Sequence, residues 1–247
     1  MEKTILITGG SRGIGAATAL LAAKRGYQVC INYVQNSTAA FSIVDQINQQ
    51  GGKAFAYQAD VSFETDVVTL FKDIDQHGPL QALVNNVGVL ETQTRVEDIT
   101  AERLQRIFTT NIISCFLCTR EAIRRMSTRH GGFGGAIVNV SSVAARTGSP
   151  GEYVDYAASK GAIDTLTIGV SKEVADEGIR VNCVRPGFIY TAIHASGGEP
   201  GRVDRIKDSV PMKRGGQPEE VANAILWLLS DEASYATGTF IDITGGR

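Results

Sequence analysis

Thr4-Ile5-Leu6-Ile7-Thr8-Gly9-Gly10-Ser11-Arg12-Gly13-Ile14-Gly15, close to the start of the chain, indicates how the chain folds. An apolar, β-branched run over residues 3–8 leads into closely spaced glycines, and a helical pattern follows from Ala16 to Lys24. Strand, glycine turn and helix in this order are typical of a site where the main chain approaches a pyrophosphate at a helix N-terminus. The spacing Thr8-Gly9-x-x-x-Gly13-Ile14-Gly15 differs from G-x-G-x-x-G, so by itself the turn supports a binding site and a purely structural turn about equally.

The alternation of strand and helix continues along the whole chain. Further strands are predicted at residues 28–33, 53–58, 82–86, 135–140, 180–184 and 239–243, with helices at 37–50, 64–76, 101–129, from about 155, and at 221–229. Ser37 is the expected cap of the helix over 37–50. Repeated strand and helix units predict an α/β fold, a single Rossmann-type doubly wound parallel sheet of seven strands with helices on both faces. Ligands bind beyond the carboxyl ends of such strands.

Length and composition predict one domain over residues 1–247. The chain is 43% hydrophobic and 20% charged with a formal net charge of -2, and it has no basic run, so neither nucleic acid nor an anionic membrane is an expected partner. Met1-Glu2-Lys3 leads directly into a short apolar run, which predicts a cytoplasmic protein without a signal peptide. No metal site is expected, and reduced core thiols are predicted for the four scattered cysteines, Cys30, Cys115, Cys118 and Cys183.

A candidate catalytic stretch runs from Ser141 to Lys160. If a helix begins near Asp155, Tyr156 and Lys160 share one face four residues apart, and a neighbouring ammonium lowers the pKa of a phenol towards the working pH. Tyr156 then becomes a general acid/base. Ser142 ends a predicted strand, from which its hydroxyl reaches the same substrate oxygen. Tyr-x-x-x-Lys alone is more often a solvated pair on a helix than a catalytic one, so the other motifs must be weighed with it.

Taken together, these motifs resemble the short-chain dehydrogenase/reductase family along nearly the whole chain. The resemblance rests, in the family's order, on Thr8-Gly9-x-x-x-Gly13-Ile14-Gly15, Asp60-Val61, Asn85-Asn86-Val87-Gly88, Asn111, Ser142, Tyr156-x-x-x-Lys160 and Pro186-Gly187-x-x-x-Thr191. Two departures are Val87 in place of alanine and a Ser142 to Tyr156 spacing one residue longer than usual. The second leaves Ser141 as an alternative catalytic serine, although Ser142, directly before Val143, is favoured.

The resemblance implies an enzyme that reversibly reduces a ketone or aldehyde with a nicotinamide cofactor. Tyr156 would be the acid/base, Ser142 would orient the carbonyl, Lys160 would hold the nicotinamide ribose and lower the pKa of the tyrosine, and Asn111 would position a water. The implied cofactor contacts add Asp60 and Val61 at the adenine, Asn86 and Gly88 near the adjoining ribose, Ile189 and Thr191 at the carboxamide, and the set Gly9, Ser11, Arg12, Gly13, Ile14, Gly15, Asn32, Tyr33, Pro186 and Gly187. Sugar-dehydrogenase-like and ketoacyl-reductase-like members both remain open as the nearest relatives. The alternative is a cofactor-binding regulator without turnover, which would be expected to lose the tyrosine or the lysine.

NADP(H) is predicted to be favoured over NAD(H). The corner after the second strand reads Asn32-Tyr33-Val34-Gln35-Asn36 and lacks the acid that would repel a 2′-phosphate. Arg12 supplies a planar cation for that phosphate. Gln35 stands where a second basic residue is often found, so the preference should be moderate.

Residues 192–210 are predicted to form a mobile substrate lid, because Ser196-Gly197-Gly198-Glu199-Pro200-Gly201 is a poor core former. Exposed charge on a loop is expected for His194, Glu199 and Arg202, and contact with a polar substrate is the alternative. A homotetramer is predicted from the small residues on the long helices, among them Ala157, Ala158, Gly161 and Ala162, and from the resemblance. The physiological substrate has no signature in the sequence.

Overall fold

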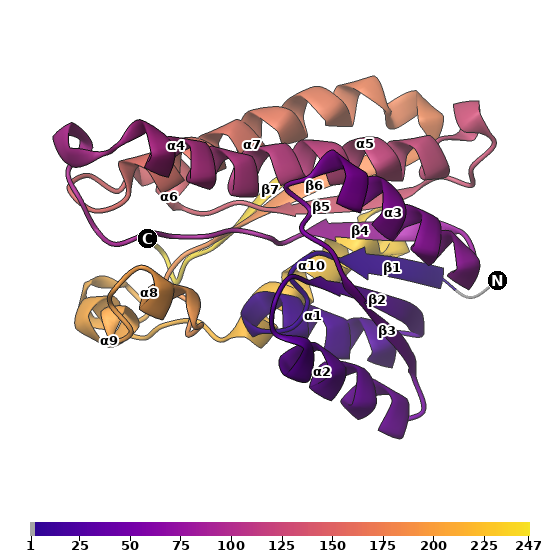
Figure 1. Ribbon diagram of the computed structural model, residues 1–247, viewed down its shortest axis with the longest axis horizontal. Helices are drawn as coiled ribbons and strands as arrows, with labels where there is room; N and C mark the ends of the chain where they lie inside the picture. Colours follow the sequence, from indigo (N-terminus) through magenta and orange to yellow (C-terminus); the bar gives the residue numbers. More distant parts are fainter. Residues whose placement is uncertain (1–2) are drawn as a thin grey trace.

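The computed structural model describes residues 3–247 and contains one parallel sheet of seven strands in the order β3-β2-β1-β4-β5-β6-β7 (Figure 1). The predicted sheet and its strand number are therefore confirmed. All six neighbouring pairs are parallel. The strands are β1 (Lys3–Ile7), β2 (Tyr27–Tyr33), β3 (Lys53–Gln58), β4 (Leu80–Asn85), β5 (Gly135–Val140), β6 (Ile179–Pro186) and β7 (Phe240–Ile243).

Helices cover both faces of the sheet, as predicted. Alternate residues of a strand point to opposite faces, so Ile5 and Ile7 pack into one core and Leu6 into the other. The helices α1 (Gly13–Lys24), α2 (Ser37–Gln49) and α10 (Pro218–Leu229) pack on the first core, and α3 (Glu64–Ile74), α5 (Ser114–Met126) and α7 (Val154–Glu173) on the second. Within residues 3–247, no helix is both long and apolar enough to cross a membrane.

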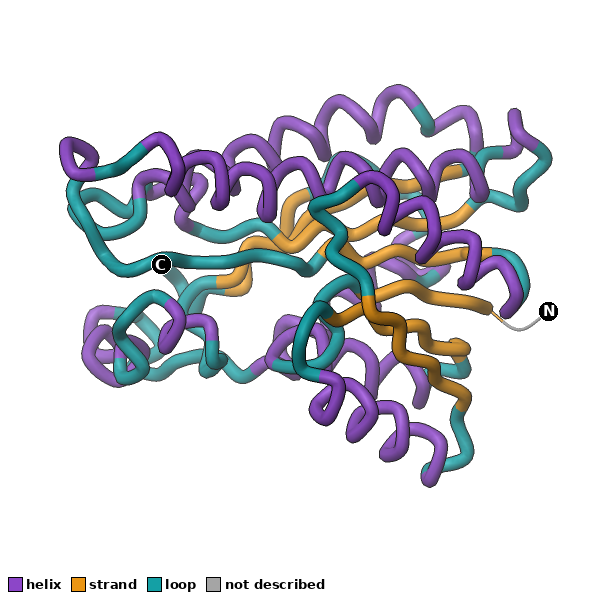
Figure 2. Tube along the Cα trace, viewed as in Figure 1, coloured by secondary structure: helices purple, strands orange, loops and turns teal. Residues whose placement is uncertain are grey.

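The strand order reverses between β1 and β4, because β2 and β3 lie on one side of β1 while β4 to β7 lie on the other. The loops that leave β1 and β4 therefore diverge, and a crevice opens at their carboxyl ends. Figure 2 shows loops and short helices gathered at this end of the sheet. The short helices here are α6 (Ala144–Thr147), α8 (Ile193–Ser196) and α9 (Arg202–Ile206).

The helix predicted over 101–129 is two helices, α4 (Ala101–Phe108) and α5, separated by a π-helical turn at Thr109–Ile113. Asn111 lies in this turn and is buried. Its side-chain oxygen accepts from the Val89 amide at 2.8 Å, and its amide group donates to the Val89 carbonyl and to Ser159 Oγ at 3.1 and 3.0 Å. The turn thus places a polar side chain where it braces two other segments, and π-helical turns are frequent at functional sites.

Other boundaries differ from the predictions because caps lie outside the apolar pattern. Asn36, not Ser37, caps α2, since its side chain accepts from the Ala39 amide at 2.9 Å. Helix α10 begins at Pro218, three residues earlier than predicted, behind a capping box of Gln217 and Glu220. The four cysteines are free and buried, as predicted. Single helical turns lie at Asp75–His77, Val96–Asp98, Thr128–His130, Ala175–Glu177, Lys207–Ser209 and Asp231–Ala233.

Candidate active site

A cavity of about 770 Å³ runs along the carboxyl edge of the sheet, from the glycine turn to α8 and α9. It brings together nearly all of the residues that the sequence singled out. The lining includes Gly9, Ser11, Arg12, Gly13, Ile14, Asn32, Tyr33, Asp60, Val61, Asn86, Gly88, Ser142, Tyr156, Lys160, Pro186, Gly187, Ile189 and Thr191. Gly15 and Asn111 are not in the lining.

The glycine turn depends on backbone geometry that other residues adopt at a cost. Gly9 and Gly13 have φ angles of +63° and +53°. At Gly15 glycine is required for space and not for its φ angle, because a Cβ there would lie 2.4 Å from the Gly9 carbonyl oxygen. The Asn86 amide donates to the carbonyls of Thr8 and Gly9 at 3.0 and 3.1 Å. Gly15 and Asn86 therefore stabilise the conformation of the turn, whose main chain faces the cavity.

The end of the cavity beside β2 holds one unpaired cation. Arg12 is exposed, and among residues 3–247 no carboxylate is ion-paired to it. The Asn32 side chain is occupied, since it donates to the Ala59 carbonyl at 2.7 Å and accepts from the Gly9 amide at 3.3 Å. Gln35 and Asn36 complete the wall. The Asp60 carboxylate accepts from the amide and hydroxyl of Ser62, which turns it towards its own loop.

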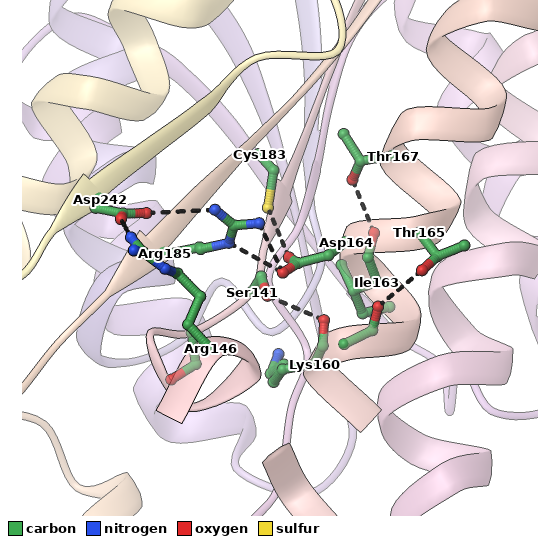
Figure 3. A network of polar contacts seen from close by, with 12 residues as sticks. Ser141, Arg146, Lys160, Ile163, Asp164, Thr165, Thr167, Cys183, Arg185 and Asp242 are labelled. Carbon is green, nitrogen blue, oxygen red and sulfur yellow. Dashed lines mark hydrogen bonds and ion pairs between the residues drawn. The ribbon is translucent and has the colours of Figure 1, made fainter. Parts of the chain in front are cut away.

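The two candidate serines have different environments. Ser141 is buried, and its hydroxyl donates to the Lys160 carbonyl at 3.1 Å (Figure 3). Both serines line the cavity, and Ser142 is the one whose side chain lowers the pKa of Tyr156. The Ser142 hydroxyl oxygen accepts from the Ala144 amide at 3.1 Å. The geometry thus favours Ser142 as the serine beside the tyrosine, and Ser141 as a brace for α7.

Lys160 is held by β5. Its ammonium donates to the Val140 carbonyl at 2.8 Å and lies 5.6 Å from the centre of the Tyr156 ring. A Cβ on Gly88 would lie 3.2 Å from this ammonium, so glycine leaves the room that the lysine needs. The predicted shared face of Tyr156 and Lys160 is present, but the ammonium is directed to a backbone carbonyl.

The expected fall in the pKa of Tyr156 is not found. Burial raises the pKa of Tyr156 to about 12, and the neighbouring Ser142 side chain acts in the opposite direction. Burial also lowers the pKa of Lys160. Because Lys160 Nζ is hydrogen-bonded to Val140 and is not in contact with the phenol oxygen, it contributes little to the phenol. The protein alone therefore keeps Tyr156 protonated, in the form that can donate a proton to a substrate oxygen.

The opposite end of the cavity contains residues whose burial the sequence did not indicate. His194 and Arg202 are 8% and 6% exposed, which corrects the expectation of exposed loop charges. Arg202 is ion-paired with Glu152 and with Glu199, and its guanidinium lies 4.8 Å from the centre of the Tyr153 ring. The contacts with Glu152 and Tyr153 join segments about 50 residues apart, so no local pattern could have revealed them.

His194 lines this part of the cavity, and one of its ring nitrogens is buried without a hydrogen-bond partner among residues 3–247. Its Nε2 lies 3.0 Å from the Ile189 carbonyl oxygen. A carbonyl only accepts, so Nε2 carries the proton and Nδ1 is the acceptor of a neutral ring. Burial lowers the pKa of His194, which favours this neutral form. Nδ1 is buried without a hydrogen-bond partner among the described residues.

Comparison with known proteins agrees with this geometry. Residues 9–247 match the family model described as enoyl-(acyl carrier protein) reductase. A solved mutant of a Serratia marcescens short-chain dehydrogenase/reductase is 32% identical and superposes with a TM-score of 0.90, covering 99% of this chain and 97% of the other. The chain belongs to the short-chain dehydrogenase/reductase family. It is an oxidoreductase of that family by these similarities.

Two further relatives of the family refine the comparison. An uncharacterized oxidoreductase of Escherichia coli (strain K12), YgfF, is 68% identical over 243 residues, 98% of each chain. A short-chain dehydrogenase from Burkholderia cenocepacia J2315, solved in complex with NADP, is 29% identical with a TM-score of 0.90, covering 99% of this chain and 97% of the other. The family implies a nicotinamide cofactor, and the cavity fits one chemically. Its glycine turn exposes main chain at a helix N-terminus, Arg12 is an unpaired cation, and Lys160 reaches the wall beside Gly88.

Proposed function

We propose that this protein is an NADP(H)-dependent oxidoreductase that reversibly reduces a ketone or aldehyde to an alcohol. The single observation that carries the proposal is that Tyr156, Ser142 and Lys160 line the same cavity as the glycine turn and Arg12. A bound nicotinamide would supply or accept the hydride. The protein then has to hold the carbonyl, stabilise charge on its oxygen and move one proton.

The proposed proton donor is Tyr156, and Ser142 is the second donor to the substrate oxygen. A phenol with a pKa of about 12 is protonated at neutral pH and gives up its proton only as negative charge develops on that oxygen. Lys160 would exchange its bond to Val140 for the nicotinamide ribose when the cofactor binds. Asn111 would act indirectly, since its side chain is occupied by Val89 and Ser159.

The proposed preference for NADP(H) depends on the cavity end beside β2. Arg12 is positioned to meet a 2′-phosphate, and Gln35 and Asn36 offer neutral donors. No acid follows β2 in the sequence up to Asn36. The related dehydrogenase solved with NADP supports the same choice.

Of the two substrate classes that the sequence leaves open, the cavity favours a compact hydroxylated carbonyl compound, such as a sugar or polyol derivative. His194 Nδ1 is an acceptor without a donor among the described residues. The ion pair of Glu152 and Arg202 offers both acceptors and donors. Hydroxyl groups match such a wall because each one donates and accepts. A ketoacyl substrate is the second candidate, supported by the description of the matching family model. Residues 192–210, which include α8 and α9, are the proposed lid over this end, within a single domain spanning the chain.

The test is a panel assayed with NADPH and with NADH: hydroxyacetone, a set of aldoses and aldonolactones, and an acetoacetyl thioester. The proposal expects turnover of hydroxylated compounds, faster with NADPH. His194→Phe should reduce turnover of the hydroxylated compounds more than that of a matched ketone without the hydroxyl group. Tight NADPH binding with no turnover across the panel would instead support the non-catalytic regulator. Turnover of the thioester alone would support the ketoacyl reductase.

A further inference from the structure

A series of side chains of alternating charge links α7, β6, β7 and α6 (Figure 3). It begins at Asp164 on α7, whose carboxylate is paired with Arg185 of β6 at 2.8 Å. Arg185 is also 3.6 Å from Asp242 of β7, and Asp242 is paired with Arg146 of α6. This set, Asp164, Arg185, Asp242 and Arg146, is called the Asp164 network below.

The Asp164 network joins the elements that carry the proposed catalytic groups. Arg146 lies four residues after Ser142, and Asp164 lies four residues after Lys160, one turn further along α7. Arg185 is the last residue before the Pro186-Gly187 segment of the cavity wall, and its guanidinium stacks 4.0 Å from the centre of the Phe240 ring. Arg185 Nε also donates to Asp164 at 2.9 Å. Two nitrogens of the guanidinium therefore contact the carboxylate and fix the orientation of the pair.

The groups around Lys160 explain why the charge of Asp164 is important for the Lys160 ammonium. Burial lowers the pKa of the Lys160 ammonium, and three groups oppose that effect: Cys115 of α5, Cys183 of β6 and Asp164 of α7. Burial raises the pKa of both thiols to about 12, so they are neutral at neutral pH. The Tyr156 phenol, the remaining titratable group beside Lys160, is also neutral. Asp164 is the carboxylate among these groups, and it is ion-paired with Arg185.

We propose that Asp164 is a positioning residue, which fixes the Lys160 turn of α7 against β6 through Arg185 and supplies the negative charge that accompanies the Lys160 ammonium. It touches neither the cavity nor a reacting atom, and acts through Lys160. The proposal rests on the proposed function for its effect on turnover, but its effect on cofactor binding can be measured separately.

The test compares Asp164→Asn with Arg185→Gln, which disrupt the same ion pair with opposite changes of charge. NADPH affinity, followed by nucleotide fluorescence between about pH 7 and 11, should fall on the alkaline side as Lys160 loses its proton. Asp164→Asn should move this fall to lower pH, by about 0.5 to 1 unit, and Arg185→Gln should move it to higher pH. The alkaline limb of carbonyl reduction should move in the same directions, since both changes act on the proton-donating form of the site.

Glu121→Gln is the matched control, because Glu121 is a buried carboxylate of α5 paired with Arg124 and Arg125 outside the cavity. It should lower the melting temperature without moving the NADPH profile. Asp164→Glu should restore the wild-type profile if Asp164→Asn folds poorly. If the pH dependence of NADPH affinity does not move, or if Asp164→Asn and Arg185→Gln move it in the same direction, the Asp164 network has only a structural role. Normal shifts in NADPH binding with no turnover of any carbonyl would instead refute the proposed function alone.

Discussion

At the scale of single residues, Tyr156 is the group on which turnover should depend most. Tyr156→Phe keeps the ring and its packing but removes the proton donor, so we expect turnover to fall by at least about 10²-fold, in line with the contribution of a general acid. NADPH affinity should stay within a few-fold of the wild type. Steady-state kinetics and a fluorescence titration on the same preparation check both parts, and near-normal turnover would remove Tyr156 from the mechanism.

Arg12 should set the cofactor preference, because it is the unpaired cation at the cavity end beside β2. Arg12→Ala should weaken NADPH binding by roughly 1–3 kcal/mol, the value of a charge-assisted hydrogen bond, and NADH binding by much less. Calorimetric titration with each nucleotide gives the comparison. The interpretation is wrong if the wild-type protein prefers NADH, or if the variant loses affinity for both nucleotides equally.

At the scale of elements, α8 and α9 are tethered more firmly than a glycine-rich loop would be. Glu199 accepts from Gln93 at 2.7 Å and from Arg205 at 2.8 Å, and Arg205 holds the pKa of Glu199 down to about 2. Glu199→Gln should loosen this segment, so trypsin should cleave after Arg202 or Arg205 several-fold faster, and the substrate KM should rise. Glu97→Gln, which breaks an exposed pair with Arg95, is the control and should change neither.

The contact between β3 and the turn after α3 should make stability depend on pH. The Tyr57 hydroxyl is hydrogen-bonded to His77 Nε2, and the His77 ring stacks 3.7 Å from Phe55 between ring centres. Burial lowers the pKa of His77, so the folded state holds this ring neutral. The unfolded chain protonates it first as the pH falls below about 6.5, and this stabilisation is therefore lost on acidification.

Chemical unfolding at pH 7 and pH 5 tests this contact. The wild type should lose more free energy of unfolding between the two values than His77→Gln, which keeps an acceptor for Tyr57 but does not titrate. Equal losses in the two proteins would show that His77 does not contribute to acid sensitivity.

At the scale of the whole molecule, we propose a homotetramer. Helices α5 and α7 cover the same face of the sheet, and their outer surfaces carry Phe116 and Ile168, which are 50% and 43% exposed (Figure 1). Gly161 and Gly169 of α7 have open space where a Cβ would stand, so another helix can approach closely. Sedimentation at micromolar concentration should show four chains of 26.4 kDa, and Ile168→Lys should dissociate them. A stable wild-type monomer would contradict the proposal.

The sheet, its seven strands and most residues of the cavity wall could be predicted from the amino-acid sequence. The buried part of β1 is mainly apolar, and this pattern is local, as are the glycine turn and the four-residue spacing of Tyr156 and Lys160. The ends of α2 and α10 were less accurate because capping residues are polar and stand outside the apolar period.

The pairing of distant polar groups could not be predicted from local patterns and became visible in the folded chain. Asn111 bonds Ser159 across 48 residues, Arg202 pairs with Glu152 across 50, and Arg185 pairs with Asp164 across 21. The distinction between Ser141 and Ser142 depended on which hydroxyl is bonded to α7 and which side chain acts on Tyr156. Periodicity reports which side of an element is apolar, whereas a hydrogen bond or an ion pair depends on distances set by the packing of distant elements. The direction of the Tyr156 pKa shift followed for the same reason, because burial and the Val140 carbonyl, not sequence spacing, set the surroundings of the phenol and of Lys160.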